Sequence, residues 1–276
     1  MTEPSGLAGA GPVFLIGAGK MGYALAQGWL RAGLDPSQLV LVDPHPQPLI
    51  SDFAVGQGMR LVEQVPSEAP RVLVLAVKPQ MMPSVLPTLR QSVGAETLVI
   101  SIAAGISIAS LADALGTNKI VRTMPNTPAQ LGRGITGAVP AAGVGAVDRD
   151  LADALLKAAG EVLWFDEEAK IDAVTAVSGS GPAYVFHFVE ALAEAARRQG
   201  FSDEQAMQLA RATVTGAAAL LAIDPAPASV LRQNVTSPKG TTAAALEVLM
   251  GEPGLTDLLD RTVRAARARS EELGQS

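Results

Sequence analysis

A glycine-rich turn near the start of the chain carries the clearest chemical signature. Gly17-Ala18-Gly19-Lys20-Met21-Gly22 follows an apolar run at 13–16 and opens a helical pattern at about Met21. In a strand, turn and helix of this kind, the first glycine permits the tight turn, the second lets the backbone approach a pyrophosphate, and the third permits close helix–strand packing. The phosphate lies at the positive end of the helix. The turn therefore predicts dinucleotide binding, and the alternative is a purely structural glycine turn.

The second apolar run, 39–43, ends in an acidic residue, Asp43. A carboxylate at this place hydrogen-bonds the ribose 2′-hydroxyl of NAD and repels the 2′-phosphate of NADP. No arginine follows within the next ten residues. The alternative is an Asp-Pro turn with a solvated carboxylate. Asp43 is thus a candidate cofactor residue, and the choice between NADH and NADPH stays open with a slight leaning toward NADH.

Three further turns follow predicted strands. They are Ala76-Val77-Lys78-Pro79, Ile102-Ala103-Ala104-Gly105 and Met124-Pro-Asn126-Thr-Pro128. Because ligands of open parallel sheets bind beyond the carboxyl ends of the strands, the first two turns are predicted to line the nicotinamide side. Lys78 either adds positive potential there or is a solvated loop lysine. Asn126 hydrogen-bonds either the cofactor or its own turn.

Two segments in the second half of the chain, 178–184 and 234–242, place backbone donors at predicted helix starts. Such a start can cradle a carboxylate, or it can be an ordinary helix cap. Neither segment holds an acid–base pair or a metal-ligand spacing, and the two histidines are too few and too far apart for a metal site. His187, in an apolar helical run, is predicted to be a packed core residue. We therefore expect no metal centre.

The elements that must position these residues change in character along the chain. From 13 to 165, short β-branched runs alternate with helical segments, which indicates a doubly wound α/β domain with a mostly parallel sheet. The strand that begins at Gly134 is expected at an edge of the sheet, as an antiparallel strand. The predicted strands are 13–16, 39–43, 72–76, 98–102, 120–124, 134–140 and 161–165.

After Asp166 the strand signals stop and alanine-rich helical periodicity follows. Pro182 suits the first turn of a helix that Gly200 ends, and Ser202 with Gln205 forms a capping-box pattern that opens the next helix. Further helices are predicted at 228–233, 241–250 and 255–272. The predicted organisation is a flexible leader at 1–11, a Rossmann dinucleotide-binding domain at 12–166 and an all-α domain at 167–276.

Composition limits the class of protein. The 276 residues suit two domains, and the net charge of −6 argues against a nucleic-acid surface. The absence of cysteine removes thiolate chemistry and suits a reducing cytosol. No signal-peptide pattern opens the chain, and no apolar run reaches the ~20 residues that span a bilayer. We expect a cytoplasmic oxidoreductase with no membrane partner, whose redox chemistry comes from a cofactor.

Six segments together closely resemble pyrroline-5-carboxylate reductase, in order and over nearly the whole chain. They are 17–22, 76–79, 101–105, 122–128, 172–184 and 234–242. The resemblance implies reduction of L-1-pyrroline-5-carboxylate to L-proline by NADH or NADPH, the last step of proline synthesis. Hydride would pass from carbon 4 of the nicotinamide to the imine carbon. Because the protonated imine is already electrophilic, positioning supplies much of the catalysis.

The resemblance also implies where the cofactor binds. It places cofactor phosphate and ribose on the turn from Gly17 to Met21, and the nicotinamide side on 76–79 with Ala103 and Ala104. It adds a cofactor contact at Asn234. Asp43 departs from the family pattern, because small hydroxyl residues that often accept NADP are expected there.

The implied substrate residues lie in the turn that opens the helix at 241–250. The resemblance places the Thr242 hydroxyl on the ring nitrogen of the substrate, and the backbone amides of the turn on its carboxylate. It also places Glu168 near a substrate contact. Lys239 departs from the pattern, which has glycine there, and it either adds a charge near the carboxylate or points to solvent. The implied substrate residues are Glu168, Ser237, Lys239, Gly240, Thr241 and Thr242.

The family's helical domain interlocks with a second copy, so the resemblance implies a dimer, and such dimers commonly assemble into decamers. Two alternatives remain at this point. A β-hydroxyacid dehydrogenase shares the glycine-rich opening and the plan of a Rossmann domain followed by helices. Such enzymes have a catalytic lysine on the interdomain helix, where this chain has Tyr184-Val-Phe-His-Phe. A non-catalytic dinucleotide-binding protein could keep the fold, but the intact turn at 237–242 argues against a decayed substrate site.

Overall fold

The computed structural model describes residues 6–274. The chain divides into two compact units. The first holds the described residues up to Ser180 together with those from Ala266 onward, and the second is Gly181–Ala265. Of the predicted leader, residues 1–5 lie outside the described part, whereas Leu7 and Ala10 are buried among core residues of the first unit.

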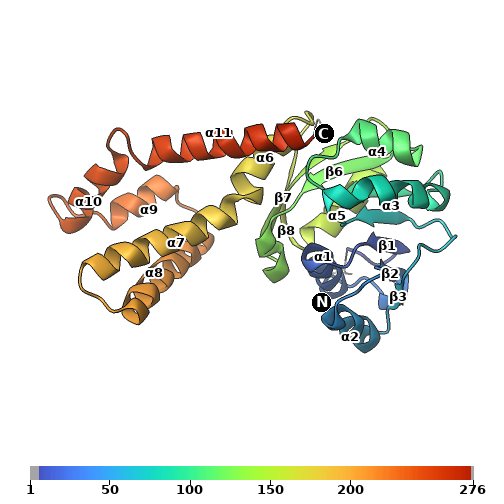
Figure 1. Cartoon of the computed structure of the whole chain (residues 1–276), viewed down its shortest axis with the longest axis horizontal. Coiled ribbons are helices and arrows are strands. Elements are labelled where there is room, and N and C mark those ends of the chain that lie inside the picture. Colours follow the sequence, from blue (N-terminus) through green and yellow to red (C-terminus); the bar gives the residue numbers. More distant parts are fainter. Residues whose placement is uncertain (1–5, 275–276) are drawn as a thin grey trace. The chain divides into compact units, whose positions relative to one another are not determined.

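The first unit is built on one twisted sheet, which contains eight strands within residues 6–274 (Figure 1). All neighbouring strands run parallel except β6 and β7, which are antiparallel. From β1 the chain winds outward through β2 to β3 and then returns to β4 on the other side of β1, in the order β3-β2-β1-β4-β5-β6-β7-β8. The carboxyl ends of β1 and β4 therefore flank a topological switch point, where open α/β sheets bind ligands. The strands are β1 (Val13–Ile16), β2 (Leu39–Val42), β3 (Arg60–Val62), β4 (Val72–Leu75), β5 (Leu98–Ser101), β6 (Ile120–Met124), β7 (Gly134–Pro140) and β8 (Gly160–Trp164).

Helices cover both faces of this sheet, which explains why β1, β2, β4 and β5 are buried along their whole length and are apolar throughout except for Ser101 at the end of β5. Leu15 and Val74 pack on one face, in a cluster that includes Trp29 of α1 (Lys20–Arg31) and Leu155 of α5 (Ala146–Lys157). Phe14, Ile16 and Leu73 pack on the other face, in a cluster with residues of α3 (Met82–Leu89) and α4 (Ile108–Leu115). Helix α2 (Pro48–Gln57) adds Ile50 and Ala54 to the first cluster.

The predicted doubly wound α/β fold is confirmed, with two corrections. The strand β7 is antiparallel as predicted, but its expected edge position is wrong, because β8 pairs with it on the outside. The prediction also missed β3, whose three residues Arg-Leu-Val are exposed or half-buried and so lack the apolar run that marks the central strands. Its backbone pairs with β2 and extends the sheet at the other edge.

The second unit is helical, as predicted. Helices α7 (Gly181–Arg198) and α8 (Asp203–Ile223) pack through small side chains, including Ala193 and Ala206. The predicted capping box is confirmed, because the Gln205 amide donates to the Ser202 hydroxyl and the Ser202 amide donates to the Gln205 side chain. The remaining helices are α9 (Ala228–Asn234), α10 (Thr241–Met250) and α11 (Leu255–Leu273). The residues of α11 from Ala266 onward belong to the first unit.

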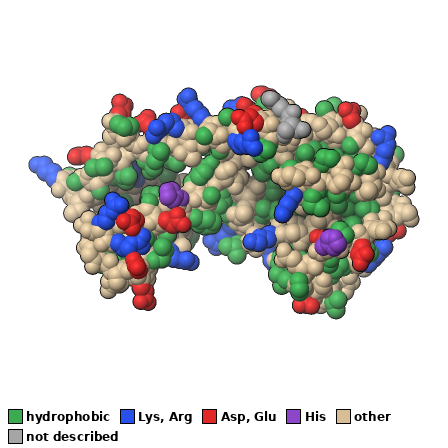
Figure 2. Space-filling view, viewed as in Figure 1, with side chains coloured by type: hydrophobic (Ala, Val, Ile, Leu, Met, Phe, Trp, Pro, Cys, Tyr) green, Lys and Arg blue, Asp and Glu red, His purple; other side chains and the backbone are tan. Residues whose placement is uncertain are grey.

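Much of the apolar surface of these helices is exposed in the single chain (Figure 2). Phe186 is 66% exposed and Leu220 is 62% exposed. Within residues 6–274, α8 is the one helix long and apolar enough to cross a membrane by length and composition alone, with 11% of its apolar window buried. The prediction that His187 is a packed core residue is wrong for this chain, because its ring is exposed and pairs with Glu190.

Candidate functional site

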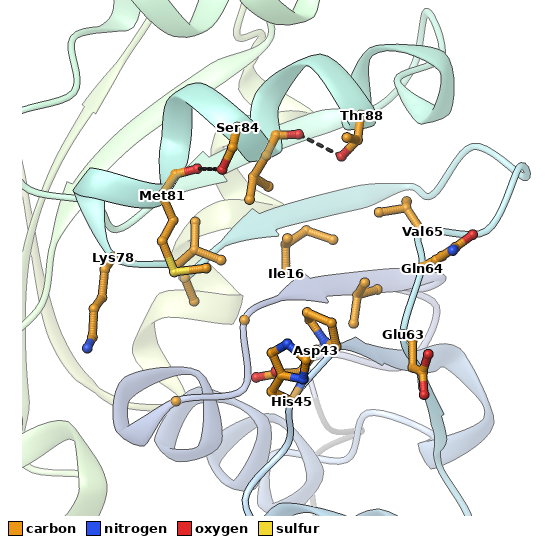
Figure 3. Close-up of a pocket in the computed structure, with 17 residues that line it drawn as sticks. Ile16, Asp43, His45, Glu63, Gln64, Val65, Lys78, Met81, Ser84 and Thr88 are labelled. Atoms are coloured by element: carbon orange, nitrogen blue, oxygen red, sulfur yellow. Dashed lines mark hydrogen bonds between the residues drawn. The ribbon is translucent and has the colours of Figure 1, made fainter.

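A cavity of about 610 Å³ opens beyond the carboxyl ends of β1, β2, β3 and β4 (Figure 3). This volume lies within the range of roughly 300–1,000 Å³ that is usual for small-molecule and cofactor sites. Its position at the switch point is the one predicted from the strand pattern. The lining residues are Ile16, Gly17, Gly19, Val42, Asp43, Pro44, His45, Glu63, Gln64, Val65, Ala76, Val77, Lys78, Met81, Ser84, Val85 and Thr88.

The three glycines of the turn after β1 differ in what a Cβ atom at each would meet. Gly17 has φ +90°, and a Cβ there would lie 2.8 Å from the Val77 side chain. A Cβ on Gly22 would overlap the Gly17 carbonyl oxygen, so this glycine permits the close packing of α1 on β1. A Cβ on Gly19 would meet nothing within 4 Å. Internal packing therefore does not require a glycine at position 19. The backbone of Gly19 is open at the start of α1, where a ligand can approach it.

The Asp43 carboxylate is fixed at the edge of the cavity by two backbone amides. The Ala18 amide donates to Oδ2 at 3.0 Å, and the His45 amide donates to Oδ1 at 2.9 Å. The Asp43 amide itself donates to the Val62 carbonyl at 3.0 Å, which ties the end of β2 to β3. The glycine-rich turn and the end of β2 are thus held together through one carboxylate.

The residues after β3 and β4 complete the cavity on either side. Glu63, which the sequence analysis did not single out, follows β3 and lines the cavity beside Gln64. Ala76, Val77 and Lys78 follow β4, and Pro79 begins a short 3-10 turn. Lys78 lies well apart from Glu63 in Figure 3. The cavity therefore brings together Gly17, Gly19, Asp43 and 76–78 of the predicted cofactor residues.

Other predicted cofactor residues lie outside this lining. Lys20 and Met21 form the first turn of α1, and Ala103 is buried in the core behind β5. Ala104 packs beside Met124 in a small separate cluster. The Asn126 side-chain oxygen accepts a hydrogen bond from the Ile135 amide at 3.0 Å, so this side chain holds the turn after β6 to the start of β7.

Glu168 belongs to a second group of charged residues in the first unit. Its Oε1 accepts from Arg122 Nη1 at 2.7 Å and from the Ile108 amide at 2.8 Å. Arg122 is 5% exposed and also faces Asp172 at 3.7 Å, while the Ser270 hydroxyl donates to Asp172 at 2.7 Å. Within residues 6–274, Arg122 Nε is the one buried side-chain nitrogen or oxygen without a hydrogen-bond partner. This cluster joins β6 to α6 (Lys170–Val174) and to the end of α11.

The predicted substrate turn lies in the second unit, between α9 and α10. Asn234 is the last residue of α9, and the Gly240 amide donates to the Ser237 carbonyl at 3.0 Å to close a tight turn. Lys239 has φ +58°, and among residues 6–274 it is the one non-glycine residue with positive φ. This left-handed conformation explains why glycine is expected there. Thr241 and Thr242 form the first turn of α10.

No group of three or more His, Asp or Glu side chains within the described part of the chain could hold a metal ion. The acidic and basic side chains around the cavity are Asp43, Glu63 and Lys78, with His45 beside Asp43. The open backbone of the glycine turn suits a phosphate group, and the Asp43 carboxylate suits a ribose hydroxyl.

Two family models match the chain. One, described as pyrroline-5-carboxylate reductase dimerisation, matches residues 168–273. The other, described as NADP oxidoreductase, coenzyme F420-dependent, matches residues 12–105. The first match includes α7 to α10 with their exposed apolar side chains, and the second includes the glycine-rich turn and all the residues that line the cavity.

Curated proteins match over nearly the whole chain. The pyrroline-5-carboxylate reductase of Pseudomonas aeruginosa is 40% identical over 267 residues, which cover 95% of this chain and 97% of that protein. The Vibrio alginolyticus pyrroline-5-carboxylate reductase is 40% identical over 266 residues, with the same coverage.

Solved structures match as well. A Coxiella burnetii pyrroline-5-carboxylate reductase is 34% identical with a TM-score of 0.88, covering 97% of this chain and 100% of that one. The Plasmodium falciparum pyrroline carboxylate reductase, solved with NADP bound, is 28% identical with a TM-score of 0.79, covering 95% and 97%.

Proposed function

The chain belongs to the pyrroline-5-carboxylate reductase family, and from this premise we propose that it reduces L-1-pyrroline-5-carboxylate to L-proline with NADH or NADPH. The observation that carries the proposal is 40% identity to a curated reductase over 95% of the chain. A match of this length covers both the cofactor cavity and the helical region. Identity of this extent to a curated reductase disfavours a β-hydroxyacid dehydrogenase, and the intact turn at 237–242 disfavours a silent dinucleotide binder.

The residues of the cavity suit a dinucleotide. Gly19 leaves the backbone approachable at the start of α1, where the helix dipole favours a pyrophosphate. We assign the pyrophosphate and ribose to Gly17, Ala18, Gly19, Lys20 and Met21. When bound, the reduced nicotinamide supplies the hydride that adds to the imine carbon, so that the carbon–nitrogen double bond becomes a single bond.

The nicotinamide side is assigned to the turns after β4 and β5. Ala76, Val77 and Pro79 present small or apolar groups there, which keep water away from the reacting atoms. Ala103 and Ala104, in the turn after β5, are proposed for the same side of the cofactor. Asn126 and Asn234 are proposed as further cofactor contacts, Asn126 through the amide group whose oxygen also serves the Ile135 amide.

The chain's own chemistry at the substrate is positioning. We assign the substrate carboxylate to the backbone amides of the turn Ser237–Thr242, at the start of α10. The Thr242 hydroxyl is proposed to hydrogen-bond the ring nitrogen, which fixes the imine carbon toward the incoming hydride. Glu168 is proposed as a further substrate residue, and its Oε1 accepts from Arg122 and from the Ile108 amide.

The helical region carries a dimerisation domain. We propose that two chains associate through the exposed apolar face of α7 to α10, and that dimers assemble further into a decamer. Pairing would remove the large apolar side chains of this face from water, including Phe186 and Leu220. The cytoplasm is the proposed compartment, in keeping with a chain that has no cysteine.

The direct test is oxidation of NADH and NADPH by the purified protein, followed by absorbance, with and without L-1-pyrroline-5-carboxylate. We expect oxidation that depends on the substrate and yields proline in equal amount, identified by chromatography. A folded protein that binds dinucleotide but shows no oxidation with either cofactor would refute the proposal.

A further inference from the structure

Among the described residues, the side of the cavity formed by β2 and β3 carries negative charge and no lysine or arginine to balance it. Asp43 and Glu63 both line it, at the carboxyl ends of these two neighbouring parallel strands. Lys78 is the only lysine or arginine among the described residues that line the cavity, and it lies on the side of β4, well apart from Glu63 (Figure 3). Residues 44–59 contain neither lysine nor arginine. Arg60 lies at the other end of β3 and pairs with Glu68.

The Asp43 carboxylate is also held in place. A carboxylate has about four lone-pair positions, two on each oxygen. The Ala18 amide takes one on Oδ2 and the His45 amide takes one on Oδ1. One position on each oxygen is left, which matches two ribose hydroxyl donors. Because two backbone amides fix the group, it cannot turn away to admit a phosphate without losing both hydrogen bonds.

We infer that this enzyme selects NADH over NADPH, through the fixed Asp43 carboxylate reinforced by the Glu63 carboxylate. The inference rests on the proposed function and names the cofactor that the reaction uses. The free ribose 2′-hydroxyl of NADH donates to Asp43. The 2′-phosphate of NADPH brings up to two negative charges to a place with two carboxylates and no lysine or arginine beside them. Among the described residues that line the cavity, His45 also lies on this side, so all variants are compared at one fixed pH.

The test compares kcat/KM for NADH and NADPH in the full-length protein and in four variants. The wild type is expected to favour NADH by roughly tenfold or more, since juxtaposed like charges discriminate strongly but solvent at an open cavity weakens them. Asp43→Ser removes the charge and adds a hydroxyl donor for phosphate, so it should move the ratio toward NADPH by roughly tenfold. Asp43→Asn should move it in the same direction. Glu63→Gln should move the ratio toward NADPH by a smaller factor than either Asp43 variant.

The matched control is Asp52→Ser, which makes the same change at an exposed residue of α2 that does not line the cavity. Its ratio should equal that of the wild type. A wild-type ratio near one or in favour of NADPH would overturn the inference. An unchanged ratio in both Asp43 variants would do the same, and would reduce Asp43 to a residue that only braces the turn.

Direct binding separates this inference from the proposed function. The fluorescence of NADH and NADPH reports their dissociation constants without any pyrroline substrate. Tighter binding of NADH that Asp43→Asn weakens would support the inference even if no turnover were found. Equal binding of both cofactors by an enzyme that makes proline would reject the inference and leave the proposed function intact.

Discussion

Thr242 is the one side chain proposed to touch the reacting part of the substrate. Replacing it with alanine removes a hydroxyl that would hold the protonated ring nitrogen. A hydrogen bond to a charged group contributes about 1.5–3 kcal/mol, so Thr242→Ala should lower kcat/KM for the substrate by roughly 10- to 100-fold. Dinucleotide affinity should stay close to that of the wild type. Steady-state kinetics and cofactor titration measure the two effects separately.

Thr242→Ser is the matched variant, because it keeps the hydroxyl and removes only a methyl group. It should retain most of the activity that Thr242→Ala loses. Equal loss of turnover and of cofactor affinity in Thr242→Ala would contradict the assigned role, since a residue that merely starts α10 would disturb both.

Lys239 adopts a conformation that costs a non-glycine residue about 1–2 kcal/mol. Lys239→Gly should therefore leave the protein at least as stable, with a gain of up to about 1 kcal/mol after the entropy cost of glycine in the unfolded chain. If the ammonium assists the substrate carboxylate, the same variant should raise KM for the substrate more than it lowers kcat. Thermal unfolding and kinetics with the substrate measure both effects.

Gly240→Ala provides the contrast, because its Cβ would overlap the Ser237 hydroxyl oxygen and should lower the melting temperature. An unchanged KM in Lys239→Gly would show that Lys239 points to solvent. A fall in its stability would show that the turn needs the lysine for packing.

In the element formed by β1, the glycine-rich turn and α1, two glycines have different roles. Gly19 is expected to serve cofactor binding, and Gly22 is expected to serve folding. Gly19→Ala adds a methyl group in open space at a φ of −65°, so the melting temperature should not change. The methyl group would stand where a pyrophosphate must approach, so dinucleotide affinity should fall by roughly tenfold or more. Gly22→Ala forces its Cβ onto the Gly17 carbonyl oxygen and should cost about 1–3 kcal/mol of stability.

Calorimetry of the free protein and titration with NADH distinguish the two glycines. A large loss of stability in Gly19→Ala would mean that the second glycine serves packing after all. Wild-type affinity in a stable Gly19→Ala variant would move the pyrophosphate away from the start of α1.

The elements that sequence reasoning placed well are those whose residues carry their own signal. The buried runs of β1, β4 and β5 and the Ser202–Gln205 capping box were predicted within a residue or two. Strand β3 was missed because its three exposed or half-buried residues show no apolar pattern. It forms through backbone pairing with β2, which the sequence of β3 does not reveal. Glu63 was missed for the same reason, since a residue after an unseen strand has no predicted place at the sheet edge.

Contacts between distant residues set the rest of the candidate site. Asp43 was selected from its position alone, but its hydrogen bond to the Ala18 amide joins residues 25 apart. The ion pair of Arg122 with Glu168 spans 46 residues, and the Ser270–Asp172 hydrogen bond spans 98. Such pairs depend on how the elements of the first unit pack together, so they cannot be predicted from the sequence pattern around either residue.

At the scale of the whole molecule, many large apolar side chains of the helices in the second unit are exposed to water in the single chain, and the single chain does not explain why. Local periodicity placed α7 to α11, but their many apolar positions allow burial against the same chain or against another one. The wrong prediction for His187 shows this ambiguity, because an apolar helical run indicates burial without indicating which chain buries it. The match of 168–273 to a dimerisation domain favours burial against a second copy.

A charge placed on this face should therefore separate the subunits. Leu220, 62% exposed on α8 in the single chain, would be buried by the proposed association, so Leu220→Glu places a carboxylate against apolar surface. Leu49→Glu on α2 is the matched control, because that leucine is 58% exposed in the first unit, outside the matched dimerisation region. Light scattering should show Leu220→Glu shifted to a smaller species with reduced proline formation, and Leu49→Glu assembled and active as the wild type. If Leu220→Glu keeps its size while both variants remain folded, α8 lies outside the subunit contact, and the face around Phe186 becomes the one to test.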